Sequence, residues 1–190
     1  GYILPGMKET VTESVDGYNV YLTIDQQIQI FLDNAVDEFN KYDPSWVTIT
    51  LADAKTGAII GSSSTPSFNP NKLNITDYKN PMVSYTYEPG STMKIFSFMS
   101  AIEENKYKGD SLYDSGKIKV DDYIISDWNK KGWGEITYDQ GFHASSNVAA
   151  SLLALNIGRA KLKDYYTALG FGKKTGISLP NEGNGIINFR

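Results

Sequence analysis

The chain has 190 residues, of which 41% are hydrophobic and 21% charged, a composition that suits a globular protein with a substantial core and excludes collagen-like repeats and intrinsic disorder. Its formal net charge of −4, with no long basic block, argues against nucleic acid as a partner. No apolar stretch approaches the roughly 20 residues that span a bilayer. The lack of cysteine excludes disulfides and thiol nucleophiles, and the presence of a single histidine excludes a multi-histidine metal site.

The N-terminal part of the sequence predicts a connector followed by a helix. Residues 1–21 mix glycine, proline, serine and charged residues without a sustained period, which is typical of a connector from a preceding region. Residues 23–26 (TIDQ) have the order of a capping box, and apolar residues recur at helical spacing from Ile24 to Phe39. We therefore expect a helix that begins with this capping box and packs through one apolar face.

A β-hairpin is predicted next. Residues 46–51 are rich in β-branched side chains, residues 53–57 have turn chemistry, and residues 58–61 are again apolar and extended in character. Residues 62–80 are rich in serine, proline and asparagine, which indicates an irregular crossing on the surface.

The remainder of the chain predicts mainly helices around a region of short strands. Residues 91–104 lack glycine and proline and are apolar around most of the helical circumference, so they indicate a largely buried central helix. Residues 105–140 suggest short strands and long loops, and residues 148–157 and 159–169 suggest two helices that each end at a glycine. We expect His143 to be a packed or partly exposed loop residue and not a catalytic group.

An SxxK motif at Ser91 and Lys94 is the first candidate for catalysis. Residues three apart on a helix share one face, so the hydroxyl and the amine lie within reach of each other. Desolvation on a mostly buried helix lowers the pKa of a lysine, and its neutral amine could then accept the Ser91 proton. The alternative, an exposed serine and a solvated lysine, is weakened because Pro89-Gly90 turns the chain sharply into an apolar helix.

An SxN triplet, Ser145-Ser146-Asn147, precedes the next apolar helix and is the second candidate. Taken alone, these residues are well explained as helix N-caps. Together with the SxxK motif, they resemble the paired motifs of the serine acyltransferases that bind penicillin.

Several further segments then fall in the order of one family. They are residues 21–25 (YLTID), 53–59 (DAKTGAI), 68–70 (FNP), 87–94 (YEPGSTMK), 125–129 (ISDWN), 132–135 (GWGE) and 145–147 (SSN). The chain thereby resembles the class B penicillin-binding proteins, and most of all the division-associated transpeptidases of Gram-positive bacteria. The resemblance implies the α+β penicillin-binding-protein and serine β-lactamase-like fold, an antiparallel sheet with a helical subdomain. It also implies that residues 22–190 form the N-terminal portion of the transpeptidase domain, with residues 1–21 as the connector.

The resemblance implies a role for each candidate residue. Ser91 is the nucleophile that attacks the D-alanyl-D-alanine end of a peptidoglycan stem peptide, and Lys94 is its base. Ser145 relays a proton toward the leaving nitrogen, and the Asn147 amide orients the substrate. The resulting acyl-enzyme crosslinks the cell wall, and β-lactams acylate the same serine.

A third family motif, Lys-Thr/Ser-Gly on a sheet strand, is not assigned to Lys174-Thr175-Gly176. These residues lie between glycine-rich and proline-containing stretches, which predict a loop and not an alternating strand. The resemblance places the genuine third motif beyond Arg190, so we expect an incomplete domain that is inactive alone, with the remainder in the longer protein or in a second chain.

Other functions share the same motifs. A D,D-carboxypeptidase or β-lactamase-type hydrolase would use water as the acceptor, and a non-catalytic β-lactam sensor or division scaffold would not turn over peptide donors. No metal or organic cofactor is implied, because acyl transfer needs only side chains and backbone donors. The expected partners are stem peptide, β-lactams, division-complex proteins and a glycosyltransferase. The expected location is the extracytoplasmic face of the bacterial membrane, through an N-terminal anchor absent from this chain.

Overall fold

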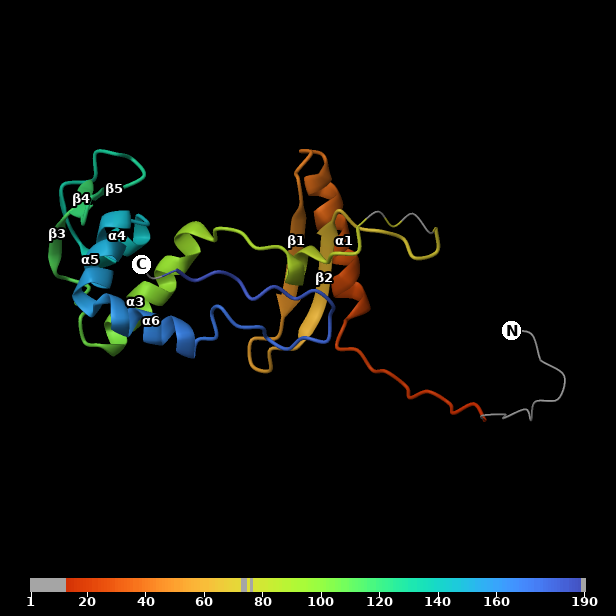
Figure 1. Ribbon diagram of the computed structural model, residues 1–190. Helices are drawn as coiled ribbons and strands as arrows, with labels where there is room; N and C mark the ends of the chain where they lie inside the picture. Colours follow the sequence, from red (N-terminus) through yellow and green to blue (C-terminus); the bar gives the residue numbers. More distant parts are fainter. Residues whose placement is uncertain (1–12, 73–74, 76, 189–190) are drawn as a thin grey trace. The chain divides into compact units, whose positions relative to one another are not determined.

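The computed structural model describes residues 13–72, 75 and 77–188. The chain divides into two compact units, the first ending at Ser67 and the second beginning at Phe68 (Figure 1). Among the described residues, no helix combines the length and the apolar character needed to cross a bilayer.

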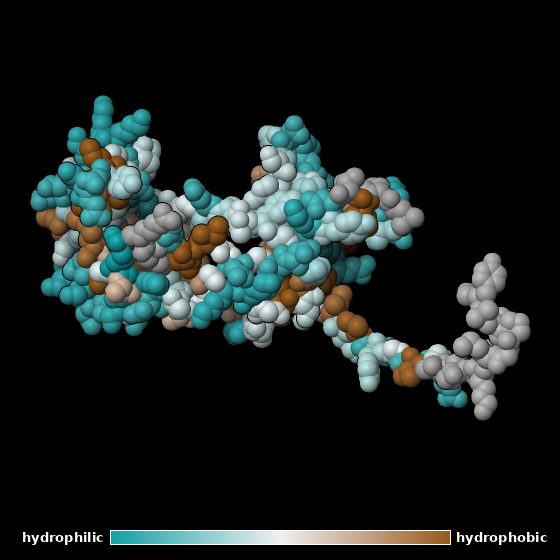
Figure 2. Space-filling view, viewed as in Figure 1, coloured by the Kyte–Doolittle hydropathy of each residue, from teal (hydrophilic) through white to brown (hydrophobic). Residues whose placement is uncertain are grey.

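The first unit contains an extended segment and helix α1 (Gln26–Asn40). The predicted helix is confirmed, but the predicted capping box is wrong. Asp25 caps the helix, because its carboxylate accepts hydrogen bonds from the backbone N–H groups of Gln27 and Ile28. The Thr23 hydroxyl donates instead to the carbonyl of Ile59 at 2.5 Å, so it is not available to the helix terminus. Figure 2 shows hydrophobic residues exposed along the extended segment before α1.

The predicted hairpin is confirmed as antiparallel strands β1 (Val47–Ala52) and β2 (Ile59–Thr65), which lie against α1 (Figure 1). Strand β2 continues to Thr65, so the prediction of an irregular crossing from residue 62 is wrong in its first part. Small serine side chains leave the backbone ladder intact, and the Gln29 side chain hydrogen-bonds both the N–H and the C=O of Ser62. These two hydrogen bonds connect β2 to α1.

The second unit is built around helices α3, α5 and α6. Its helical elements are α2 (Pro81–Ser84), the 3₁₀ turn η1 (Gly90–Met93), α3 (Lys94–Glu103), α4 (Tyr138–His143), α5 (Asn147–Ile157) and α6 (Arg159–Ala168). Phe98 and Ala101 of α3 pack with Val148, Ala149 and Leu153 of α5 in the core. The two predicted C-terminal helices are therefore confirmed.

The predicted central helix differs from the structure in two respects. Its first turn is the 3₁₀ turn η1, and α3 exposes Ile95 and Ile102 to solvent by more than half. Helix α4 was not predicted, although Thr137 and Gln140 form a capping box at its start. It is only six residues long, too short for a visible hydrophobic period. His143 accordingly lies exposed in the last turn of a helix and not in a loop.

Short strands occupy the region between α3 and α4, as predicted. Strands β3 (Leu112–Asp114) and β6 (Glu135–Thr137) pair antiparallel, and so do β4 (Lys117–Val120) and β5 (Tyr123–Ser126). With the hairpin of the first unit, the described residues mix helices and antiparallel strands, which confirms the α+β class.

Candidate active site

The SxxK motif lies where the 3₁₀ turn passes into α3. Gly90 has a φ of 63°, a backbone conformation that glycine adopts without strain, and the Thr92 hydroxyl donates to the Pro89 carbonyl at 2.8 Å. Ser91 is exposed in this turn, and Lys94 is the half-buried first residue of α3. One turn therefore separates an accessible hydroxyl from an amine that is partly removed from water.

The structure brings Lys94 and Ser145 together. The Lys94 Nζ donates hydrogen bonds to the Ser145 carbonyl at 2.5 Å and to the Ser145 Oγ at 3.1 Å. A neutral amine has two N–H groups and one lone pair, so these two bonds leave the lone pair free. The arrangement can thus hold Lys94 in place and still allow it to accept a proton.

Burial affects the charge of Lys94. Desolvation lowers the pKa of its amine below the usual 10.5, and the negative charge of Asp127 opposes this effect in part. The neutral form is therefore easier to reach than in a solvated lysine.

The SxN triplet begins α5. Ser145 has a φ of 54°, a left-handed conformation that is uncommon for residues other than glycine. Ser146 is the N-cap, with its hydroxyl accepting from the Ala149 N–H at 3.0 Å, as the capping interpretation predicts. The Asn147 Nδ2 donates to the Ser126 carbonyl at 2.8 Å. Three successive residues thus have three different environments, and only Ser145 hydrogen-bonds Lys94.

Asp127 is a residue that sequence reasoning missed. It is 1% exposed, and its Oδ1 accepts hydrogen bonds from the Ser146 hydroxyl at 2.8 Å and from the N–H groups of Asn147 and Val148 at 2.7 and 3.1 Å. Its Oδ2 accepts from the Gly116 N–H at 2.8 Å. Burial raises the pKa of this carboxyl, but these four hydrogen bonds outweigh it and hold the pKa below its usual value. Sequence offered only its place in the 125–129 family segment, because these contacts are nonlocal.

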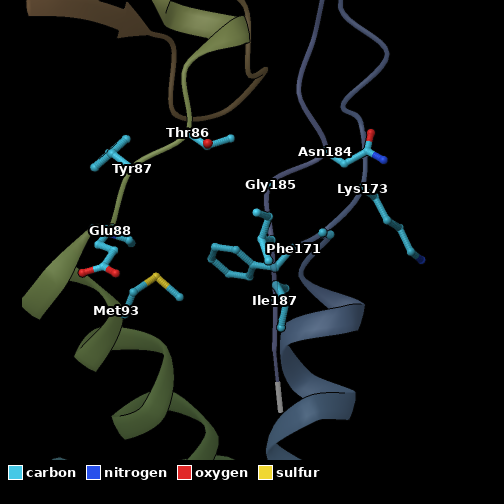
Figure 3. Close-up of a pocket in the computed structure, with 13 residues that line it drawn as sticks. Thr86, Tyr87, Glu88, Met93, Phe171, Lys173, Asn184, Gly185 and Ile187 are labelled. Carbon is cyan, nitrogen blue, oxygen red and sulfur yellow. The ribbon is translucent and has the colours of Figure 1, made fainter. Parts of the chain in front are cut away.

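A cavity of about 670 Å³ lies beside the SxxK motif. One wall comes from Glu88, before η1, and Met93, the last residue of η1, and the other from the C-terminal segment, with Phe171 and Ile187 (Figure 3). Among the described residues, its lining includes neither Ser91 nor Lys94, and neither residue of the SxN pair. The cavity flanks the candidate catalytic groups and does not contain them.

Lys174-Thr175-Gly176 lies in irregular structure, as predicted. The Glu182 carboxylate accepts hydrogen bonds from the Thr175 N–H and hydroxyl, both at 2.6 Å, and from the Gly176 N–H at 3.2 Å. The polar groups of Thr175 and the Gly176 N–H are therefore engaged within a local loop, whereas the Lys174 amine takes no part in these hydrogen bonds.

Residues 47–190 match the family model described as penicillin binding protein transpeptidase domain. The stage V sporulation protein D of Bacillus subtilis is 36% identical over 98% of this chain, and the peptidoglycan D,D-transpeptidase FtsI of Escherichia coli K12 is 31% identical over 92%. The chain spans 30% of the length of each of these relatives.

A solved structure shows the same architecture. Penicillin binding protein 2X from Streptococcus thermophilus superposes with a TM-score of 0.85 and 31% identity, over 94% of this chain and 28% of that one. This agreement confirms the predicted transpeptidase fold. Since the family model covers the segment that holds both the SxxK and the SxN motif, the chain belongs to the penicillin-binding protein transpeptidase family, in its class B branch.

Proposed function

We propose that this chain provides the acyl-transfer residues of a serine-type peptidoglycan D,D-transpeptidase. The observation that carries the proposal is the contact of Lys94 Nζ with both the carbonyl and the hydroxyl of Ser145, one turn beyond Ser91. Family membership and a relative whose name specifies D,D-transpeptidase activity support this reaction over hydrolysis.

In the proposed acylation, the Ser91 hydroxyl oxygen attacks the carbonyl carbon between the two terminal D-alanines of a stem peptide. Lys94 takes the hydroxyl proton, and the backbone N–H of Ser91, near a helix start, is one donor to the developing oxyanion. The carbon–nitrogen bond then breaks. A proton that passes through Ser145 neutralises the leaving nitrogen, and D-alanine departs.

The second half of the reaction reverses these proton movements. The amine of a neighbouring stem attacks the acyl-enzyme ester, gives its proton to the base, and forms the new amide as the Ser91 oxygen leaves with a proton. Asn147 orients the donor peptide through its amide, whose Nδ2 is already held by Ser126. The β-lactam ring is attacked in the same way, and its acyl group stays on Ser91.

The proposed reaction also implies where the full-length protein is located and which macromolecules it meets. Stem peptides lie outside the cytoplasm, so we place the full-length protein on the extracytoplasmic face of the membrane. Division-complex proteins and a glycosyltransferase are the proposed macromolecular partners, on the resemblance of the sequence to the division-associated transpeptidases.

Intact-mass spectrometry of the full-length protein after incubation with benzylpenicillin tests the chemistry. We expect one adduct, mapped to the peptide that contains Ser91 and absent in Ser91→Ala. Reaction with a stem-peptide donor and an amine acceptor then separates transpeptidation, which gives a crosslinked dimer, from hydrolysis, which gives a free acid. An adduct on another residue, or none on the folded protein, contradicts the proposal and favours the scaffold function.

A further inference from the structure

We infer that Asp127 is a positioning residue for acyl transfer: its buried carboxylate holds the start of α5 so that Ser145 presents its carbonyl and hydroxyl to Lys94. The inference rests on the proposed function and assigns a role to a residue outside both motifs. Asp127 is not placed in contact with substrate.

The Asp127 carboxylate is held in place by hydrogen bonds on both of its oxygens. A buried carboxylate is costly unless it is fully hydrogen-bonded, and here four donors from two parts of the chain satisfy it. Two of the donors, the N–H groups of Asn147 and Val148, belong to the first turn of the 11-residue helix α5, where N–H groups lack intrahelical partners. The carboxylate thus fixes the position of the helix start as well as its charge environment.

The residues on either side of Asp127 contact the same region. The Ser126 carbonyl accepts from the Asn147 side chain at 2.8 Å, and the Trp128 Nε1 donates to the Ala144 carbonyl at 3.0 Å. Residues 126–128 therefore hold the chain on both sides of Ser145. Asp127 is the buried member of this segment, whereas the Trp128 side chain is 69% exposed.

Ser145 needs such support because its backbone is strained. A non-glycine residue in the left-handed region is sterically unfavourable and persists only where neighbouring contacts determine it. The φ of 54° at Ser145 accompanies the orientation in which its carbonyl meets Lys94. Without the Asp127 hydrogen bonds, the chain from Ala144 to Asn147 could relax and separate Ser145 from the amine.

The charge of Asp127 also acts on Lys94 without direct contact. Desolvation lowers the Lys94 pKa, and Asp127 is the charged group that raises it again. Tyr113 is the other titratable group that feels the Asp127 charge, with Tyr138 beside it, and burial raises the pKa of both tyrosine hydroxyls. Both tyrosine hydroxyls stay neutral near physiological pH, so removing the Asp127 charge does not change their protonation. The pKa that changes with consequence for acylation is that of Lys94.

The test compares Asp127→Asn with the full-length wild-type protein in benzylpenicillin acylation of Ser91. Asparagine keeps an oxygen for the α5 donors but loses the charge and places N–H groups toward Gly116. We expect the plateau rate constant to fall on the order of 100-fold, the effect of misplacing a reacting group by about 1 Å. Removing a negative charge lowers the Lys94 pKa, so the acidic limb of the pH profile should move to lower pH. Asp122→Asn, at an exposed carboxylate between β4 and β5, is the matched control and should match wild type.

Two outcomes overturn the inference. One is an Asp127→Asn protein with the wild-type rate constant and pH profile. The other is a smaller fraction of protein molecules that benzylpenicillin can acylate, with the rate constant and the pH profile of the reactive fraction unchanged. That result would mean that Asp127 contributes to folding alone. If Asp127→Asn does not fold, Ser146→Ala removes one donor to the carboxylate more mildly; a lower rate constant at full site occupancy supports the inference, and a wild-type rate constant overturns it. Absence of Ser91 labelling in the wild-type protein is a different result, because it rejects the proposed function itself.

Discussion

Gly141 leaves room for the buried ring of Tyr113: a β-carbon at Gly141 would lie within 3.0 Å of the Tyr113 ring and hydroxyl. Gly141 lies in α4 and Tyr113 in β3, so this close approach joins the short strands to the helix that leads into the SxN triplet. The Gly141 carbonyl also accepts from the Ser146 N–H at 2.8 Å.

Gly141→Ala should therefore destabilise the protein. Overpacking of a filled site costs about 1–3 kcal/mol, because rigid neighbours must shift. Urea denaturation of the full-length protein measures the change in the free energy of unfolding. Gly17→Ala is the control, since a β-carbon there meets no atom within 4 Å, and it should change that free energy by less than about 0.5 kcal/mol. Equal stabilities of the two variants would mean that Tyr113 has room to move.

The left-handed backbone at Ser145 predicts an order of stability for two variants. Ser145→Ala and Ser145→Gly both lose the hydroxyl that contacts Lys94, so both should acylate Ser91 slowly. Glycine adopts a φ of 54° without the steric penalty of a β-carbon, so Ser145→Gly should be more stable than Ser145→Ala by about 1 kcal/mol. Thermal unfolding compares them. A more stable alanine variant would contradict the conformation seen here.

The role of Lys94 is tested by separating its charge from its basicity. Lys94→Ala should slow penicillin acylation by about 10²–10⁴-fold, the usual contribution of a general base. Lys94→Arg retains the charge but cannot deprotonate, so it should be comparably slow. Stopped-flow acylation measures both rate constants. An arginine variant close to wild type would show that positive charge, and not a neutral amine, is what the reaction needs.

The pH profile of the wild-type protein gives an independent check. Because burial lowers the Lys94 pKa, the neutral amine appears at lower pH than in a solvated lysine. The acylation rate should rise with pH through that pKa, with its midpoint below the usual lysine value of 10.5. A midpoint at or above this value would mean that Lys94 is not desolvated in the working protein.

Lys174→Ala should leave acylation within about twofold of wild type, because substitution of an exposed side chain usually has little effect. Thr175 and Gly176 remain bound to Glu182 in this variant, since the lysine side chain takes no part in those hydrogen bonds. Lys119→Ala, at an exposed lysine of β4, is the control. Loss of labelling by Lys174→Ala in a folded protein would reject the interpretation of this segment as a structural loop.

The sequence was sufficient for several elements whose determining interactions are local and repeat over ten or more residues or flank a turn, whereas the local capping box of the six-residue helix α4 was too short a signal. Helix α5 is predicted by its apolar run and helix α6 by its amphipathic pattern, each followed by a glycine, and the hairpin by the turn residues between two β-branched or apolar runs. The same holds for the SxxK pair, since three-residue spacing alone puts Ser91 and Lys94 one turn apart. The SxxK and SxN motifs and the family resemblance were likewise identified from the amino-acid sequence.

Tertiary structure decided the features that depend on distant residues. Thr23 bonds Ile59 and leaves the helix cap to Asp25, and Gln29 holds Ser62 in a strand that its composition did not indicate. Asp127 is the clearest case: its four donors come from Gly116 and from Ser146 to Val148, so only the folded chain shows the support beneath Ser145. Secondary-structure propensity and motif spacing depend on residues close together in the sequence. The hydrogen-bond partners of a buried carboxylate depend instead on which distant segments pack around it.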